Sequence, residues 1–488
     1  MWSKNKYKLM KIINEKQLWG ISITRFRIWK SFYVTLLIGS FMACDDFVEV
    51  DQPNNLLTSE LVFEDVATIN AVLRGIYADL RDGSLSDDLS VQLGLYTDEL
   101  DYFNTQNTLF DHTIIASDGT VFSWWGGAYN LIYVANAVLE SVENSTFITQ
   151  ENQDQFRGEA LFIRGYVYSL LVELFGPVPY ITNTNYIANT IVSRNDVNEV
   201  YDNIIKDLEE ALELLDNDIS GERIRPYKAV VEALLARVNL YAENWQDAED
   251  MASNVIDSGV FALESNMDEV FLKEASGTIW QFIPPSVGEN TSNAETFILF
   301  AKPTNVALYE SFIDEFEFGD QRLASWVGSI TDDGNTYYYA FKYKEKGITS
   351  ISSGSNEDLI SFEYPVVFRL AEQYLIRAEA RAELNKIAGA QSDLNVVRNR
   401  AGLRNTMSST TQELLDAILR ERRVELFTEY GHRWFDLKRW FTLERPENAA
   451  EVLTPLKPNW KDTNVLFPVP ESEILLNPNL LPQNDGYQ

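Results

Sequence analysis

The side chains best suited to acid–base chemistry lie within residues 420–440 of this 488-residue chain. His432 is one of only two histidines, and Asp436 follows it four residues later. A histidine paired with a carboxylate can act as a general acid or base. The same segment is also dense in arginine, and Glu421, Glu425 and Glu429 recur there at i,i+4 spacing. Such spacing favours ion pairs, so we interpret the segment as a charged lattice that joins two helices around Trp434 and Trp440.

Other catalytic and metal-binding patterns are missing from the sequence. The second histidine, His112, belongs to a different segment, and one cysteine excludes any paired-cysteine zinc motif. There is no HExxH, no GxSxG and no phosphate-binding GxxxxGK[ST] sequence. Residues 332–335 are typical of a turn and do not complete a calcium loop. We therefore predict no catalytic residues, no metal site and no cofactor, although 73 acidic residues leave a pair of catalytic carboxylates open.

The single cysteine, Cys44, has the surroundings of a lipidation site. An apolar run at residues 32–43 precedes it, and a stretch with eight basic residues lies further upstream. A basic region, a short apolar core and a small residue at the cut are typical of a secretory signal. We predict that residues 1–43 are a lipoprotein signal peptide and that Cys44 is lipidated after cleavage. The alternative is a free or buried thiol after a membrane anchor, but a 12-residue core is shorter than the ~20 residues that span a bilayer.

The charge of the predicted mature chain limits its partners. Removal of residues 1–43 takes away eight basic residues and one acid, which leaves 32 basic and 72 acidic residues and a net charge of −40. Nucleic acids and anionic membrane surfaces are bound through clustered lysine and arginine. The composition therefore argues against both, and a high negative charge is consistent with solubility outside the cell.

Hydrophobic periodicity divides the mature chain into helical and irregular parts. Residues 44–57 are polar and contain Pro53, so we predict a tether. Residues 58–261 and 364–488 show apolar spacings of three and four. The predicted helices are 63–80, 122–144, 151–175, 196–216, 226–242, 245–258, 364–384, 387–400 and 411–430.

Two of these helical stretches repeat one small/large pattern. Ala236, Ala248, Ala252 and Val255 have the same spacing as Ala378, Ala390, Leu394 and Val397. This spacing is typical of tetratricopeptide hairpins, in which a small residue on one helix lets the next approach. Stacked hairpins need about three copies, so other helical regions would supply diverged ones.

Residues 262–363 lack this periodicity and are rich in glycine, proline and serine. We predict loops and short strands there, forming a binding region on a helical scaffold. Flat aromatic rings beside polar groups suit sugar rings and their hydroxyls. Two segments offer this combination, residues 96–104 and residues 280–345. The candidate ligand-binding residues are Asp98, Tyr102, Asn104, Trp280, Trp326 and Tyr338, with core packing as the alternative for each aromatic ring.

Several blocks together resemble the SusD/RagB family. The C-terminal hallmark is similar to ERRVEL at residues 421–426 and RWFDLKRW at 433–440. Further similar blocks are GEALFIRG through FGPVP at 158–179, the RLAE…AEA segment at 369–380, LNVVRNRAGL at 394–403 and the FPVP…QNDGY ending at 467–487. Asp485 departs from the proline usual in the family ending. The resemblance runs from Cys44 to the last residue in the family's order.

This resemblance implies a mostly α-helical fold with four tetratricopeptide units and an irregular binding region. It also implies a lipid-anchored protein of the outer membrane, facing the cell exterior, that captures a nutrient for a SusC-like TonB-dependent transporter. Asp45 and Asp46 are similar to the surface-export signal of such lipoproteins. The nutrient expected is a glycan. The shared blocks do not identify the ligand, so a peptide or another nutrient, a carbohydrate-active enzyme and a docking protein without ligand stay as alternatives.

Overall fold

The computed structural model describes residues 65–487, apart from 84, 86–88, 144, 218, 220, 354–355 and 444. The predicted signal peptide, Cys44 and the tether lie outside the described residues. Within the described part the chain is mostly helical, as predicted. No helix there combines the length and the apolar character needed to cross a bilayer.

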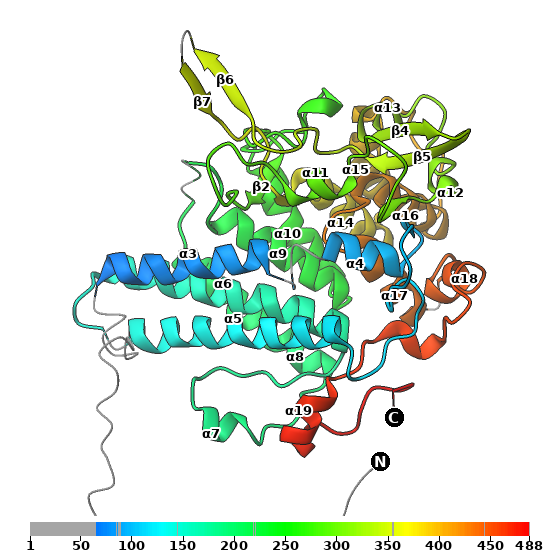
Figure 1. The fold of residues 1–488 in the computed structure, drawn as a ribbon. Coiled ribbons are helices and arrows are strands. Elements are labelled where there is room, and N and C mark those ends of the chain that lie inside the picture. The colour runs from blue at the N-terminus through cyan, green and yellow to red at the C-terminus, as the bar shows by residue number, and fades with distance from the viewer. Residues whose placement is uncertain are drawn as a thin grey trace, which may run out of the picture. The chain divides into compact units, whose positions relative to one another are not determined.

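The N-terminal half is built on long helices that lie side by side (Figure 1). They are α3 Val66–Asp82, α5 Gly119–Glu143, α6 Gln150–Phe175 and α8 Val197–Leu214. Helix α6 starts where the Thr149 side chain accepts the N–H of Asn152, and it ends at Gly176, whose φ of 69° suits glycine. Glycine also permits close packing within α6, because a Cβ at Gly165 would lie 2.8 Å from Leu208 of α8.

Two helix hairpins follow the alanine pattern of the sequence. The first is α9 Lys228–Tyr241 with α10 Trp245–Asp257, and the second is α14 Leu370–Glu383 with α15 Ile387–Arg400. Ala236, Ala248 and Ala252 are fully buried in one cluster, and Ala378 and Ala390 in another. Helices α10 and α14 also pack on each other, which joins the hairpins although 112 residues separate them in sequence. Helix α16, Thr411–Leu426, packs on α14 and begins with a capping box.

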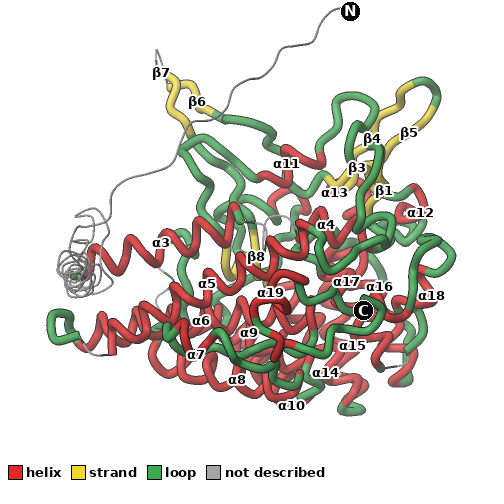
Figure 2. The backbone as a smooth tube through the Cα atoms, turned by 60° about the horizontal axis from the view of Figure 1, so that its bottom comes forward, coloured by secondary structure: helices red, strands yellow, loops and turns green. Residues whose placement is uncertain are grey.

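The described strands are short, and all but β1 and β8 lie in the region 262–363 predicted to be irregular (Figure 2). A four-stranded sheet has the order β1-β3-β5-β4. Its strands are β1 Leu100–Tyr102, β3 Val306–Leu308, β4 Val327–Asp332 and β5 Asn335–Ala340. The other two pairs are β2 Thr278–Gln281 with β8 Val366–Arg369, and the projecting hairpin β6 Ser350–Ser353 with β7 Asn356–Leu359.

Short helices connect these parts. They are α4 Leu89–Tyr96, α7 Tyr186–Asn189, α11 Ser292–Phe297, α12 Glu310–Ile313, α13 Gln321–Trp326, α17 His432–Thr442, α18 Ala449–Leu453 and α19 Glu471–Leu476, with 3₁₀ turns at Met267–Glu269, Asp462–Val465 and Pro478–Leu480.

The predicted helix boundaries needed two corrections. The helix predicted at 364–384 begins only at Leu370, because the preceding four residues pair with β2 as strand β8. The helix predicted at 411–430 ends at Leu426, and positive φ angles at Thr428, Tyr430 and Gly431 turn the chain into α17. The other seven predicted helices match described ones closely at both ends.

Candidate functional site

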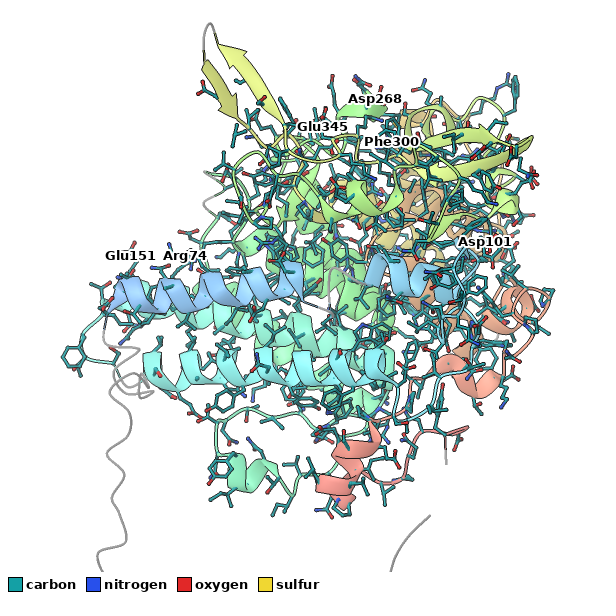
Figure 3. The ribbon with its side chains drawn as sticks, viewed as in Figure 1. Arg74, Asp101, Glu151, Asp268, Phe300 and Glu345 are labelled. Atoms are coloured by element: carbon teal, nitrogen blue, oxygen red, sulfur yellow. The ribbon has the colours of Figure 1, made fainter. Side chains whose placement is uncertain are left out.

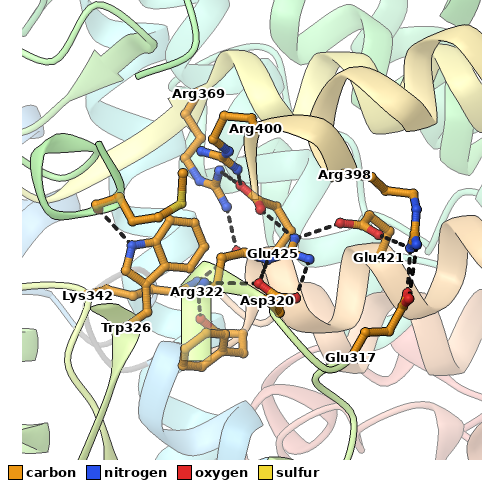
Figure 4. A network of polar contacts seen from close by, with 12 residues as sticks. Glu317, Asp320, Arg322, Trp326, Lys342, Arg369, Arg398, Arg400, Glu421 and Glu425 are labelled. Atoms are coloured by element: carbon orange, nitrogen blue, oxygen red, sulfur yellow. Dashed lines mark hydrogen bonds and ion pairs between the residues drawn. The ribbon is translucent and has the colours of Figure 1, made fainter. Parts of the chain in front are cut away.

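The glutamate stripe of α16 is bound by arginines in the interior (Figure 4). Glu425 accepts hydrogen bonds from Arg369, from Arg322 at 2.9 Å and from Arg400 at 2.5 Å. Burial works to raise the pKa of Glu425, but the three guanidinium groups hold it well below its usual range. Glu429, just beyond the end of α16, continues the pattern by pairing with Arg369 and Lys342. The network joins α16 to β8 and α13, so the role of these ion pairs is to hold the three elements together.

His432 and Asp436 do not pair as an acid–base dyad. His432 is 4% exposed, and its Nε2 lies 3.5 Å from a guanidinium nitrogen of Arg237. Burial and the arginine charges around it lower the pKa of His432 well below its ordinary value. Asp436 is instead bound by Arg422 at 2.7 Å and by Arg439 at 3.0 Å. The lattice interpretation is therefore the right one for this pair, and Trp434 and Trp440 are buried within it.

No group of three or more histidine, cysteine, aspartate or glutamate side chains among the described residues could hold a metal ion.

Trp280 and Trp326, two of the predicted ligand-contact residues, have no exposed surface. Trp280 on β2 packs edge-on against Phe162 and Tyr166 of α6. Trp326 closes α13, where its Nε1 donates to the carbonyl of Met267 and the Lys342 ammonium lies 5.1 Å from its ring centre. Their assignment to the ligand site was wrong, because burial of large aromatic rings stabilised the core at both positions.

Asp98 lies within the predicted binding segment 96–104, but its charged partners bury it. Its carboxylate is bound by Arg433 and by Arg423, and it is 6% exposed. Although burial opposes ionisation, these guanidinium groups hold the pKa of Asp98 far below its usual range. A carboxylate so engaged has little capacity for a ligand, so Asp98 anchors the segment that follows it.

The remaining predicted residues meet at the four-stranded sheet. Tyr102 ends β1, and Tyr338 lies on β5 opposite Leu308 of the strand between them. Both tyrosines are partly buried against the cluster of apolar side chains below the sheet. Asn104 follows β1 in an exposed loop. The structure therefore brings Tyr102 and Tyr338 to one sheet, roughly two strand spacings apart. Asn104 lies beside them, in the loop that follows β1.

Two further aromatic rings at this sheet were not among the predicted contacts. Phe103 and Tyr337 meet edge to face with ring centres 5.6 Å apart. Both are partly exposed, and neither packs against the apolar cluster below. The N–H of Phe103 donates to the carbonyl of Asn305, which extends the β1–β3 pairing to this position. Successive side chains of a strand point to opposite faces, so Tyr337 and Tyr338 face opposite sides of β5. This alternation could have suggested Tyr337 and Phe103 as a pair on the other face. We define Phe103 and Tyr337, with Asn104 in the adjoining loop, as the aromatic face; Tyr102 and Tyr338 instead pack on the apolar cluster below the sheet.

One buried lysine lies beneath the sheet, on the side of Tyr102. The Lys457 ammonium donates to the carbonyl of Leu95 at 2.9 Å and lies 3.7 Å from the ring centre of Phe110, which in turn packs against Tyr102. Burial lowers the pKa of Lys457 to about 7. Asp101, labelled on this side of the molecule in Figure 3, adds negative charge nearby. No sequence signal marked Lys457, because a single lysine between loops has no periodicity.

Comparison with known proteins identifies the architecture. The model described as the SusD family matches residues 315–487, and the model described as starch-binding associating with outer membrane matches residues 46–240. The chain belongs to the SusD family. The SusD-like protein P2 of Formosa agariphila is 28% identical over 94% of this chain and 99% of its own length.

Solved structures share the SusD fold along most of this chain. A SusD superfamily protein from Bacteroides vulgatus superposes with a TM-score of 0.74 at 19% identity, covering 87% of this chain and 100% of its own. A laminarin-binding SusD-like protein superposes with a TM-score of 0.71 at 24% identity, with the same coverage. The resemblance found in the sequence blocks is thereby confirmed, and the family is associated with starch binding at the outer membrane.

Proposed function

We propose that this SusD-family protein binds a glycan at the aromatic face and delivers it to a SusC-like TonB-dependent transporter, without catalysing a reaction itself. The observation that carries the proposal is the edge-to-face pair Phe103 and Tyr337, which is partly exposed beside Asn104. Flat rings pack on the C–H faces of sugars, and rigid aromatic side chains lose little entropy on binding.

The family match supports the ligand class and the cellular location. The matched family is described as starch-binding and associated with the outer membrane, and one structural neighbour is named for laminarin binding. We infer that the lipidated Cys44 holds this protein on the outer membrane, facing the cell exterior. A surface receptor needs a partner to move its ligand inward, and the transporter supplies that step.

Calorimetry of the purified mature chain against soluble glycans tests the binding step. We expect one glycan class to bind, and Phe103→Ala and Tyr337→Ala each to weaken it tenfold or more, about 1.4 kcal/mol. Phe147→Ala is the matched control, because Phe147 is 76% exposed and lies between α5 and α6, outside the sheet. Unchanged affinity in both face variants would exclude the aromatic face.

The same titrations with peptides separate the two nutrient classes. Binding of peptides and of no glycan would reject the proposed ligand class. Copurification of a tagged chain with a TonB-dependent transporter from solubilised outer membranes tests the delivery step independently of the ligand.

A further inference from the structure

A pocket of about 480 Å³ lies among α5, the loop that contains α7, and α19. Figure 1 shows α7 and α19 at the opposite end of the ribbon from β4 and β5, so the pocket is separate from the aromatic face. Its volume falls within the roughly 300–1,000 Å³ of small-molecule sites. Its lining includes four aromatic side chains, Trp125, Tyr129, Tyr133 and Tyr186.

Hydrogen bonds between the three segments fix the walls of this pocket. The Tyr129 hydroxyl donates to the carbonyl of Pro179 at 2.9 Å, which ties α5 to the loop. The Asn477 side chain donates to the carbonyl of Val192 at 2.8 Å, and Asn479 donates to that of Ile191 at 2.7 Å. The C-terminal segment is therefore attached to the same loop. Gly126 of α5 leaves the floor open, because a Cβ built there would have no atom within 4 Å.

The rings in the pocket are available to a ligand. Tyr133 is 51% exposed and Tyr186 is 72% exposed, while Leu476 beside them is 78% exposed. Several large, exposed side chains with apolar surface that line one pocket are typical of a binding site.

Among the described residues that line the pocket, Glu473 alone is charged. Its carboxylate is half-buried and forms no hydrogen bond or ion pair with another described residue. Burial raises the pKa of Glu473, and no neighbouring cation lowers it. Partial burial of a carboxylate that has no charged partner costs free energy. A positively charged group that enters the pocket can therefore form an ion pair with Glu473 and offset this cost.

Three other polar side chains of the pocket, Asn189, Thr190 and Asn477, already form hydrogen bonds within the chain. Asn477 both donates to the carbonyl of Val192 and accepts from Asn479, and Thr190 donates to the carbonyl of Ile187. The Asn189 side chain donates to the carbonyl of Asn183. A sugar presents many hydroxyls that each need a partner, and these internal bonds occupy part of the polar groups that the lining offers. A ligand with one charged group and an apolar body fits this lining better.

We propose that the pocket binds a small organic cation, an ammonium group carried on an apolar or aromatic body. The rings of Tyr133 and Tyr186 attract the cation through their electron-rich faces, and the Glu473 carboxylate pairs with it. The apolar body packs against Leu476 and the floor at Gly126.

Titration with 2-phenylethylammonium and its uncharged analogue 2-phenylethanol at pH 7 tests the charge requirement. We expect the ammonium compound to bind at least tenfold more tightly to the mature chain. Glu473→Gln removes this preference, whereas Glu471→Gln, an exposed acid on the same helix, keeps it. Equal affinity for both compounds, absence of binding, or an unchanged preference in Glu473→Gln would overturn the proposal.

A second pair of variants tests the location without weakening the fold. Gly126→Leu fills the open floor and should abolish binding of the ammonium compound. Gly75→Leu is its match, because Gly75 is also helical, has the same open space and lies outside the pocket. Leucine favours helix over glycine, so both variants should melt no lower than the wild type. Retained binding in Gly126→Leu would place the cation elsewhere and overturn the proposal. Neither variant touches Phe103 or Tyr337, so glycan binding reports separately on the aromatic face.

Discussion

Arg433 of α17 donates two hydrogen bonds to Asp98, from Nε at 2.8 Å and from Nη2 at 2.9 Å. The two residues are 335 positions apart, and both are buried. Arg433 belongs to the C-terminal block that the SusD family shares, whereas Asp98 immediately precedes the strand that carries Tyr102. The shared scaffold thus positions the segment on which we place ligand binding.

Asp98→Asn should destabilise the protein strongly. Removal of one charge from a buried ion pair leaves the Arg433 guanidinium without the carboxylate that binds it, a loss of about 3–5 kcal/mol, whereas Arg423 keeps its ion pair with Glu315. Urea unfolding at pH 7 measures it. Asp333→Asn, at the exposed turn between β4 and β5, should leave the midpoint unchanged. A difference below 1 kcal/mol between the two variants would contradict the anchoring role of Asp98.

Glu99→Gln should change how stability depends on pH. Burial, with a further contribution from Asp98, raises the pKa of Glu99 to about 7, against 4.5 for a free glutamate. Between these values the folded chain holds a proton that the unfolded chain releases, so stability from this group is full below pH 4.5 and is lost as the pH rises through 7. The glutamine variant should therefore gain stability over the wild type from pH 5 to pH 8, by at most about 1.4 kcal/mol per pH unit.

Urea unfolding at four pH values from 5 to 8 checks this slope. Glu310→Gln, an exposed position at the start of α12, provides the baseline and should run parallel to the wild type. Parallel curves for Glu99→Gln as well would show that Glu99 titrates normally in the folded chain.

The sequence predicted the long helices well because their buried faces repeat with helical period over several turns. It predicted the small-residue contacts of Ala236 and Ala378 for the same reason, since local spacing sets them. It failed for Trp280 and Trp326, because a tryptophan in a short strand or turn has the same local sequence whether it lies inside or outside. The aromatic face depends on pairing between β1, β3 and β5, and the pocket depends on α19 reaching α5, so neither follows from local pattern.

Trp434→Ala should lower stability and leave ligand affinity intact. The ring is fully buried and meets Tyr96 edge to face at 4.7 Å. Truncation of a buried tryptophan leaves a cavity and costs about 3–5 kcal/mol. Thermal unfolding measures the loss, and calorimetry on the folded fraction should return the wild-type affinity. A large fall in affinity at an unchanged melting temperature would make Trp434 a ligand contact.

Cys44→Ala should release the protein from the outer membrane. Cys44 is the only thiol of the chain and follows the apolar core of the predicted signal, although it lies outside the described residues. Several acyl chains hold a protein firmly on a bilayer, whereas the mature chain, with a charge of −40, has no electrostatic reason to stay on an anionic surface.

Fractionation should be done in cells that lack the partner transporter, because docking alone could retain the variant. Under these conditions we expect the wild type in the outer-membrane fraction and Cys44→Ala in the soluble fraction. A variant that still sediments with the outer membrane would show that another part of the chain anchors it.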